Sequence, residues 1–225
     1  MLPDKILILT GSPPLHGFGH FQRCINLKQE LNLLGHKTRL RFFSNKKVSA
    51  SSEKFIIIDS RDVHIPEQKS KFLIFLDNRS ESKPLNSISI DTLPHLDQTR
   101  DEFLKAMSFF MGSAPFPNFK TRPLRSSLSL IKKAVRPSVK KKYEEFQKSL
   151  IRNKTRIHGY FGLTLLESLQ AGKNFQCRIL TPYHWQLSVH LKRELNYSKK
   201  ALTLLDGKGI KRLAKAISSA VKLPE

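Results

Sequence analysis

Short apolar runs alternate with amphipathic segments along the first hundred residues, and this alternation constrains the fold more than any other feature of the sequence. Lys5–Thr10 is an apolar run of strand length, and so are Phe55–Asp59 and Phe72–Asp77. Such runs are typical of parallel strands that are buried on both faces. Lys37–Phe43 and Ser87–Asp91 have the length and character of two further strands. We therefore expect an α/β unit built on a parallel sheet.

A helix is expected between the first two strands. Residues 20–34 carry apolar side chains at helical spacing, and Gly35 follows them as the glycine that ends the helix. A strand–helix–strand unit of this kind makes a right-handed parallel crossover. The apolar positions of this helix are Cys24, Leu27, Leu31 and Leu34.

The C-terminal part repeats the alternation over a shorter length. The expected strands cover 156–158, 175–181 and 201–205, and the expected helices cover 163–171, 184–195 and 210–221. The predicted organisation is an N-terminal Rossmann-like domain over 1–98, a basic helical connector over 99–154, and an abbreviated C-terminal α/β domain over 155–225.

The positive charge of the chain is concentrated in the connector. The net charge is +22, from 40 Lys+Arg against 18 Asp+Glu, and residues 120–156 hold 13 basic and only 2 acidic residues. The 39% hydrophobic content excludes a wholly disordered basic chain. We expect helices near 124–134 and 138–152. A solvated linker explains this stretch, and so does a basic face toward anionic lipid, nucleic acid or a nucleotide diphosphate.

Specific nucleic acid is not expected as a partner. Residues 120–156 have no zinc-finger spacing, no helix-turn-helix pattern and no sheet motif with interleaved aromatic residues. Charge alone gives only a non-specific affinity that salt weakens. Interspersed Leu, Ile, Val and Phe over 124–150 also suit an anionic membrane surface.

Several classes of protein are excluded by what the sequence lacks. No apolar run approaches the roughly 18 residues that a membrane span needs, and no secretory signal is visible. We expect a cytoplasmic protein that could meet the inner membrane face through 120–156. Cys24 and Cys177 are too few for a disulfide framework or a four-cysteine zinc site, so both are expected to be buried. No metal and no cofactor are expected.

The loop after the first strand carries the clearest chemistry. Gly17 and Gly19 allow a tight turn, and the helix N-terminus that follows them favours an anionic group. His20 lies at the helix start, where a neutral imidazole can take a proton from water or from a sugar hydroxyl. Arg23 follows one turn later, on the same face. The alternative is a histidine that only hydrogen-bonds the loop.

Two carboxylates end predicted strands. Asp59 and Asp77 each close an apolar run, so both are expected at the carboxyl edge of the sheet, where open α/β sheets bind their ligands. Loop capping or a salt bridge is the competing interpretation for both residues.

The sequence from Gly17 to Leu27, with Gly-x-Gly-His followed by Arg23 and Cys24, resembles the opening of a nucleotide-sugar enzyme family. This family comprises the UDP-sugar hydrolases of pseudaminic acid synthesis and their spore-coat polysaccharide relatives, which share the glycosyltransferase-B fold. The resemblance implies two Rossmann-like parallel-sheet units, with the second unit abbreviated in this chain. It also implies that His20 and Arg23 are catalytic, that Gly17 and Gly19 bind substrate, and that Asp59 and Asp77 belong to the first domain's site.

A second stretch, Gly162–Lys173, is similar to the donor-nucleotide motif of that fold. The resemblance implies that backbone amides near Gly162 and the Thr164 hydroxyl hold a diphosphate, that Glu167 accepts from the ribose diol, and that Gln186 also contacts the nucleotide. Between the two matching stretches the resemblance fails, because the basic connector replaces about half a domain.

Two functions from different classes follow from the resemblance. One is a UDP-sugar hydrolase or glycosyltransferase with His20 as general base. The other is a catalytically inactive scaffold that binds a nucleotide sugar, which the shortened second half favours. A basic protein that binds nucleic acid or membrane is the third and weakest interpretation. The sequence leaves the sugar, the acceptor and the oligomeric state open.

Overall fold

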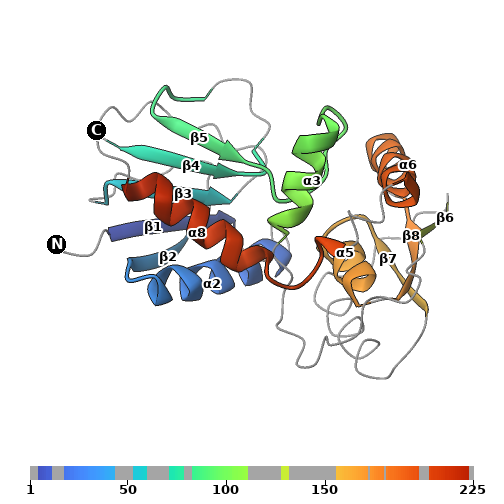
Figure 1. Ribbon diagram of the computed structural model, residues 1–225, viewed down its shortest axis with the longest axis horizontal. Helices are drawn as coiled ribbons and strands as arrows, with labels where there is room; N and C mark the ends of the chain where they lie inside the picture. The colour runs from blue at the N-terminus through green and yellow to red at the C-terminus, as the bar shows by residue number, and fades with distance from the viewer. Residues whose placement is uncertain are drawn as a thin grey trace. The chain divides into compact units, whose positions relative to one another are not determined.

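The computed structural model describes residues 5–11, 18–43, 53–59, 71–78, 83–110, 128–131, 156–171, 173–179, 181–197 and 203–222. The chain divides into two compact units. Unit 1 comprises Met1–Thr92 together with Ile210–Glu225, and unit 2 comprises Leu93–Gly209. These boundaries differ from the expected 1–98, 99–154 and 155–225, because the end of the chain belongs with its beginning. Figure 1 shows the elements of both units.

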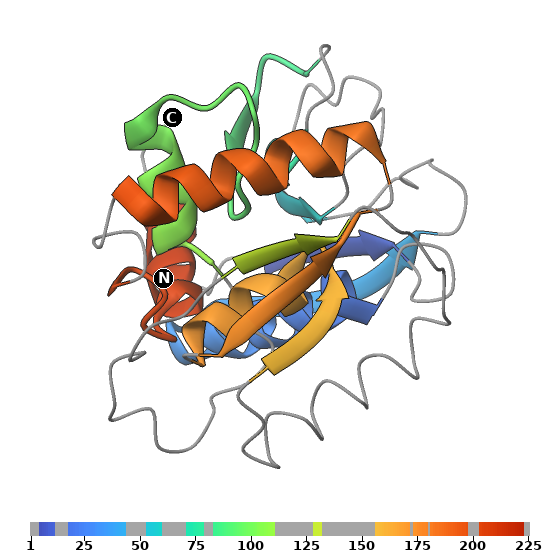
Figure 2. The same cartoon turned by 90° about the vertical axis from the view of Figure 1, so that its right-hand side faces the viewer.

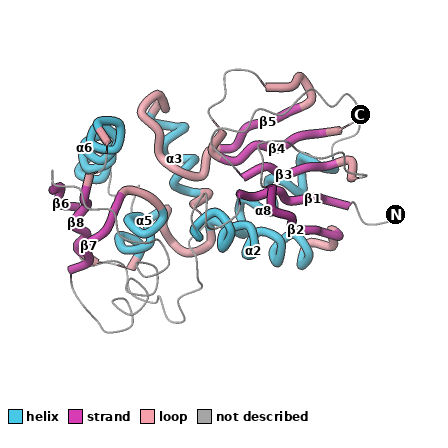
Figure 3. The backbone as a smooth tube through the Cα atoms, turned by 180° about the vertical axis from the view of Figure 1, so that it is seen from behind, coloured by secondary structure: helices cyan, strands magenta, loops and turns pink. Residues whose placement is uncertain are grey.

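Unit 1 is built on a five-stranded sheet in the order β2-β1-β3-β4-β5, and every neighbouring pair is parallel. The strands appear in magenta in Figure 3. The expected α/β unit with a parallel sheet is confirmed. The strands are β1 (Lys5–Gly11), β2 (Lys37–Phe43), β3 (Phe55–Asp59), β4 (Phe72–Leu76) and β5 (Ser87–Ile90).

Helix α2 (Phe18–Leu33) connects β1 to β2. Its apolar side chains Cys24, Leu27 and Leu31 are fully buried, as the helical spacing predicted. The helix ends before Gly35, whose φ of 92° lies in the left-handed region that glycine tolerates best. The Thr38 hydroxyl of β2 donates to Asn32 Oδ1 at 2.7 Å, which ties the end of α2 to the strand that follows it.

Helix α8 (Gly209–Lys222) closes unit 1 from the far end of the chain. One of its faces is buried, through Leu213, Ala214 and Ile217. His36, in the turn between α2 and β2, lies with its Nε2 2.8 Å from the Ser218 hydroxyl oxygen. This hydrogen bond joins residues 182 positions apart, and α8 lies on the same side of the sheet as α2 (Figure 1).

Unit 2 has a three-stranded parallel sheet in the order β6-β8-β7, seen from another side in Figure 2. Its buried core joins side chains of the helices and strands, among them Phe103, Leu165, Phe175 and Leu191. The elements are α3 (Arg100–Ser108), β6 (Leu128–Ile131), β7 (Arg156–Tyr160), α5 (Leu163–Gln170), β8 (Asn174–Arg178) and α6 (Pro182–Tyr197).

The structure corrects two expectations in this part of the chain. The helix expected near 124–134 is wrong in its described part, because residues 128–131 form β6 and pair with β8. The pairing partner is distant in sequence, so local periodicity gave no sign of it. The strand expected over 201–205 is also wrong in its described part, since residues 203–205 form a helical turn and an irregular residue. The helix expected over 138–152 lies outside the described residues. Among the helices that the structure describes, none combines the length and apolar character of a membrane span.

Candidate functional site

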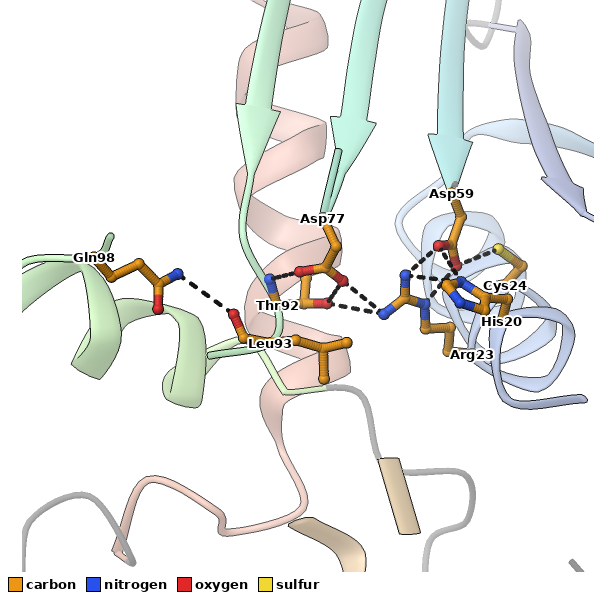
Figure 4. A network of polar contacts seen from close by, with 8 residues as sticks. All are labelled: His20, Arg23, Cys24, Asp59, Asp77, Thr92, Leu93 and Gln98. Atoms are coloured by element: carbon orange, nitrogen blue, oxygen red, sulfur yellow. Dashed lines mark hydrogen bonds and ion pairs between the residues drawn. The ribbon is translucent and has the colours of Figure 1, made fainter. Parts of the chain in front are cut away.

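Three strand ends and one helix start meet at the carboxyl edge of the unit 1 sheet (Figure 4). Asp59 is the last residue of β3, Asp77 follows β4, and Thr92 follows β5. His20 and Arg23 lie in the first turns of α2, after β1. The strand order reverses at β1, because the chain moves outward to β2 and then returns to β3 on the other side. In open parallel sheets such a switch point is where ligands bind.

Arg23 is the centre of the network. Its side chain is 1% exposed, and its Nε and Nη2 donate as a fork to the two carboxylate oxygens of Asp59. Its Nη1 donates to Asp77 Oδ2 at 2.7 Å and to the Thr92 hydroxyl at 3.2 Å. A planar guanidinium that bonds on three sides cannot turn without breaking several charge-assisted bonds. Arg23 therefore fixes the positions of both carboxylates.

Asp77 is held from the opposite side by Thr92. The Thr92 backbone N–H donates to Asp77 Oδ1 at 2.7 Å, and the Thr92 hydroxyl donates to Asp77 Oδ2 at 2.6 Å. Asp77 is fully buried and has a φ of 52°, the left-handed region that aspartate tolerates better than most residues. This conformation places the carboxylate between β5 and α2.

His20 lies at the open side of the network, with a side chain that is 23% exposed. Its Nδ1 is 2.8 Å from Asp59 Oδ1. We assign the hydrogen to Nδ1, because an unprotonated Nδ1 would set its lone pair against a carboxylate oxygen. Arg23 Nη2 also lies 3.2 Å from Nδ1, but the contact of Nδ1 with Asp59 is the shorter of the two. The other ring nitrogen, Nε2, has no hydrogen-bond partner among the described residues and can accept a proton.

The charges of the network set its ionisation. Burial alone raises the pKa of Asp59, but the charges of Arg23 and His20 outweigh it and lower this pKa from 3.8 to about 2. Burial alone lowers the pKa of Arg23, and the two carboxylates raise it well above its usual value. Asp59 is therefore ionised at neutral pH. Asp59 and Asp77 both pair with Arg23, and Asp59 also pairs with His20.

Cys24 donates its thiol hydrogen to Asp59 Oδ2 at 3.2 Å. Burial, and then the charge of Asp59, raise the pKa of this thiol well above its usual value. Cys24 is therefore a neutral donor that completes the shell around Asp59, and both cysteines are buried as expected.

This placement changes the role of Arg23. The resemblance implied that Arg23 is catalytic, and the structure places its guanidinium in a buried position facing Asp59, Asp77 and Thr92. Arg23 acts on His20 through Asp59, and its Nη2 also lies 3.2 Å from His20 Nδ1. For Asp59 and Asp77, the structure shows the salt bridges that the competing interpretation described, and those salt bridges also orient His20. Gly19 lies in the first turn of α2, and Gly17 lies outside the described residues.

The residues expected to bind a nucleotide lie in unit 2. Gly162 precedes α5 with a φ of 147°, so the predicted glycine turn into a helix is present. Thr164 is half-buried in the first turn, and Gln186 is exposed on α6. Glu167 is only 1% exposed, whereas the prediction placed its carboxylate toward a ribose. His20 and Glu167 belong to different units.

Sequence reasoning missed two parts of these sites. The first is Thr92, to which the sequence-based predictions assign no role. Its position as a polar residue directly after the expected strand 87–91 could have indicated a place at the edge of the sheet. The second is an aromatic contact at the carboxyl edge of the unit 2 sheet. Phe161 follows β7, and its ring stacks on the ring of His184, in the first turn of α6, at 6.0 Å and 17°. The two residues are 23 positions apart, so no local pattern links them.

Comparisons with protein-family models, with curated proteins and with solved structures found no match to this chain.

Proposed function

We propose that this chain is a nucleotide-sugar-processing enzyme of surface-glycan synthesis, in which His20 is the general base. The observation that carries the proposal is the His20–Asp59 pair, 2.8 Å apart at the carboxyl edge of a parallel sheet. Nδ1–H donates to an ionised carboxylate, and Nε2 is left to accept a proton. An imidazole held in this way is a common general base in enzymes.

The reaction class follows from what Nε2 can do. When Nε2 takes a proton from a hydroxyl group, Asp59 compensates the charge of the imidazolium that forms, as an aspartate does in catalytic triads. If the hydroxyl belongs to water, the enzyme is a hydrolase that cleaves the bond between sugar and nucleotide. If it belongs to a second sugar, the enzyme is a glycosyltransferase. The ionised carboxylate of Asp59 beside His20 supports both reactions equally.

The substrate class rests on the resemblance of two stretches rather than on the pair itself. Gly19, His20, Arg23 and Cys24 follow the family's opening motif. In unit 2, Gly162 turns into α5 as the donor-nucleotide motif requires, and the first amides of a helix favour phosphate. The fold that goes with this proposal is of the glycosyltransferase-B type, with an abbreviated second unit.

The test is to incubate the purified chain with a panel of UDP-sugars and to measure released UDP. We expect turnover of at least one donor. His20→Asn should lower kcat about 10²- to 10⁴-fold, the usual contribution of a general base. His158→Asn, a change at an exposed histidine of β7, is the matched control and should leave kcat unchanged. UDP release without an added sugar acceptor indicates a hydrolase, and release that requires an acceptor indicates a transferase.

Binding measurements separate the enzyme from an inactive scaffold. Calorimetry with UDP and with UDP-sugars should show binding by both the wild type and His20→Asn. Binding without turnover in the wild type would favour the scaffold. Turnover that His20→Asn leaves unchanged would remove His20 from the mechanism.

A further inference from the structure

We propose that Asp77 and Thr92 are positioning residues for His20, although neither of them touches it. This inference rests on the proposed function, in which His20 is the base. It goes beyond that function by assigning a role to the ends of two other strands, β4 and β5. The path runs from Thr92 to Asp77, then to Arg23, to Asp59 and finally to His20 (Figure 4).

The first step fixes Asp77. Thr92 gives it two hydrogen bonds, one from the backbone N–H and one from the hydroxyl, at 2.7 and 2.6 Å. The backbone N–H of Asp77 donates to the backbone oxygen of Ile90, the last residue of β5, at 3.1 Å. A left-handed φ of 52° persists only where surrounding bonds hold it. The end of β5 is therefore the anchor of the path.

In the second step, the rigid guanidinium of Arg23 connects the fixed Asp77 to Asp59. Nη1 of Arg23 points to Asp77 and Thr92, while Nε and Nη2 point to Asp59. Because the guanidinium is planar and delocalised, fixing Nη1 also fixes the plane in which the other nitrogens meet Asp59. Without the Asp77 carboxylate, Nη1 would keep only its bond to the Thr92 hydroxyl, and the guanidinium would be held less firmly against Asp59.

The third step sets the imidazole. Asp59 Oδ1 receives the bonds of both Arg23 Nη2 and His20 Nδ1. The position of this oxygen decides whether Nδ1 keeps its hydrogen, and so whether Nε2 is the free base. Asp77 and Thr92 therefore control the tautomer of His20 from two strands away.

Nitrogen-15 NMR of the histidine rings tests this path without any substrate. The variants are Asp77→Asn, Thr92→Val and the matched control Thr92→Ser, which keeps the hydroxyl. In the wild type and in Thr92→Ser we expect neutral His20 to carry its hydrogen on Nδ1. In Thr92→Val and Asp77→Asn we expect a mixture in which the Nε2–H form, favoured by free imidazole in water, gains population. Circular dichroism shows which variants fold.

Two outcomes would overturn the inference. One is a wild type in which His20 carries its hydrogen on Nε2. The other is a folded Thr92→Val variant with the wild-type tautomer. Thr92→Val removes a single hydroxyl, so it decides the question even where Asp77→Asn does not fold.

Kinetics distinguish a failure here from a failure of the proposed function. With an active donor, Asp77→Asn should lower kcat by roughly 10- to 100-fold, as removal of an outer-shell partner commonly does, and should leave KM within about twofold. If no UDP-sugar turns over but the tautomer responds as expected, the proposed function fails and the positioning path stands. If the wild type turns over a donor, and neither kcat nor the tautomer changes in Asp77→Asn and Thr92→Val, only the positioning path fails.

Discussion

Arg23 of helix α2 and Asp59 at the end of strand β3 form a two-nitrogen fork with both carboxylate oxygens, inside unit 1 and 36 residues apart. The fork joins the crossover helix to the strand on the other side of β1. Both side chains are at most 1% exposed, so each depends on the other to compensate its charge.

Replacing Arg23 by Met should strongly destabilise unit 1. The change removes the cation that the buried carboxylates of Asp59 and Asp77 share, and breaking one side of a buried pair costs about 3–5 kcal/mol. Arg23→Lys keeps the charge but cannot form the fork, so its loss should be smaller. Urea unfolding followed by far-UV circular dichroism measures both losses.

The fluorescence of Trp185, the single tryptophan, provides the control for that experiment, because it reports on unit 2. Its unfolding transition should move less than the circular dichroism transition. Equal stability of the wild type and Arg23→Met would show that the fork contributes nothing.

The stability of the protein should fall in acid through Asp59. Its pKa is 3.8 when unfolded and about 2 when folded, so the native state holds the proton less tightly. The contribution of Asp59 is fully present above pH 3.8 and is lost as the pH falls toward 2. The difference of 3.8 − 2 corresponds to about 2 kcal/mol.

Unfolding free energies between pH 2 and 6 measure this slope. Asp59→Asn should reduce it, while Asp101→Asn, at an exposed residue of α3, should retain it. An unchanged slope in Asp59→Asn contradicts the assignment.

Gly159 should not tolerate a side chain. A Cβ at this position of β7 would lie 2.7 Å from the Phe175 ring, which is fully buried on β8. Overpacking of this kind typically costs about 1–3 kcal/mol. Gly159→Ala should therefore destabilise unit 2, as read from Trp185 fluorescence. Adding Phe175→Leu should recover part of the loss, and strictly additive losses would show that the two groups do not meet.

The thiols of the native protein should be nearly inert. Burial raises the pKa of Cys177 to about 11, and it also raises the pKa of Cys24. Since the thiolate is the nucleophile, an aromatic disulfide reagent at pH 8 should label neither residue until denaturant is added. Ser219→Cys, at an exposed position of α8, is the control that should react at once. Fast labelling of the native wild type would contradict the burial of both thiols.

The first sheet was predictable because its signals are local. Uninterrupted apolar runs predicted β1, β3 and β4, and Gly35 predicted the end of α2. The same runs placed Asp59 and Asp77 at one edge of the sheet. What could not be predicted depends on pairs that are distant in sequence. A basic, serine-rich stretch gives no sign that residues 128–131 will pair with β8. The sequence around Arg23 does not show whether its guanidinium contacts a ligand or holds buried carboxylates. Its 1% exposure and its hydrogen-bond partners in the structure answer this question.

The hydrogen bond between His36 and Ser218 has a consequence for how the protein is made. Unit 1 is discontinuous, since all of unit 2 is inserted between β5 and α8. During translation, the strands of unit 1 leave the ribosome well before the helix that buries Leu213, Ala214 and Ile217 against them. All of unit 2 is therefore synthesised before the helix that completes unit 1. We expect a chain interrupted before residue 210 to lack a complete unit 1 and to be cleaved by proteases faster than the full chain.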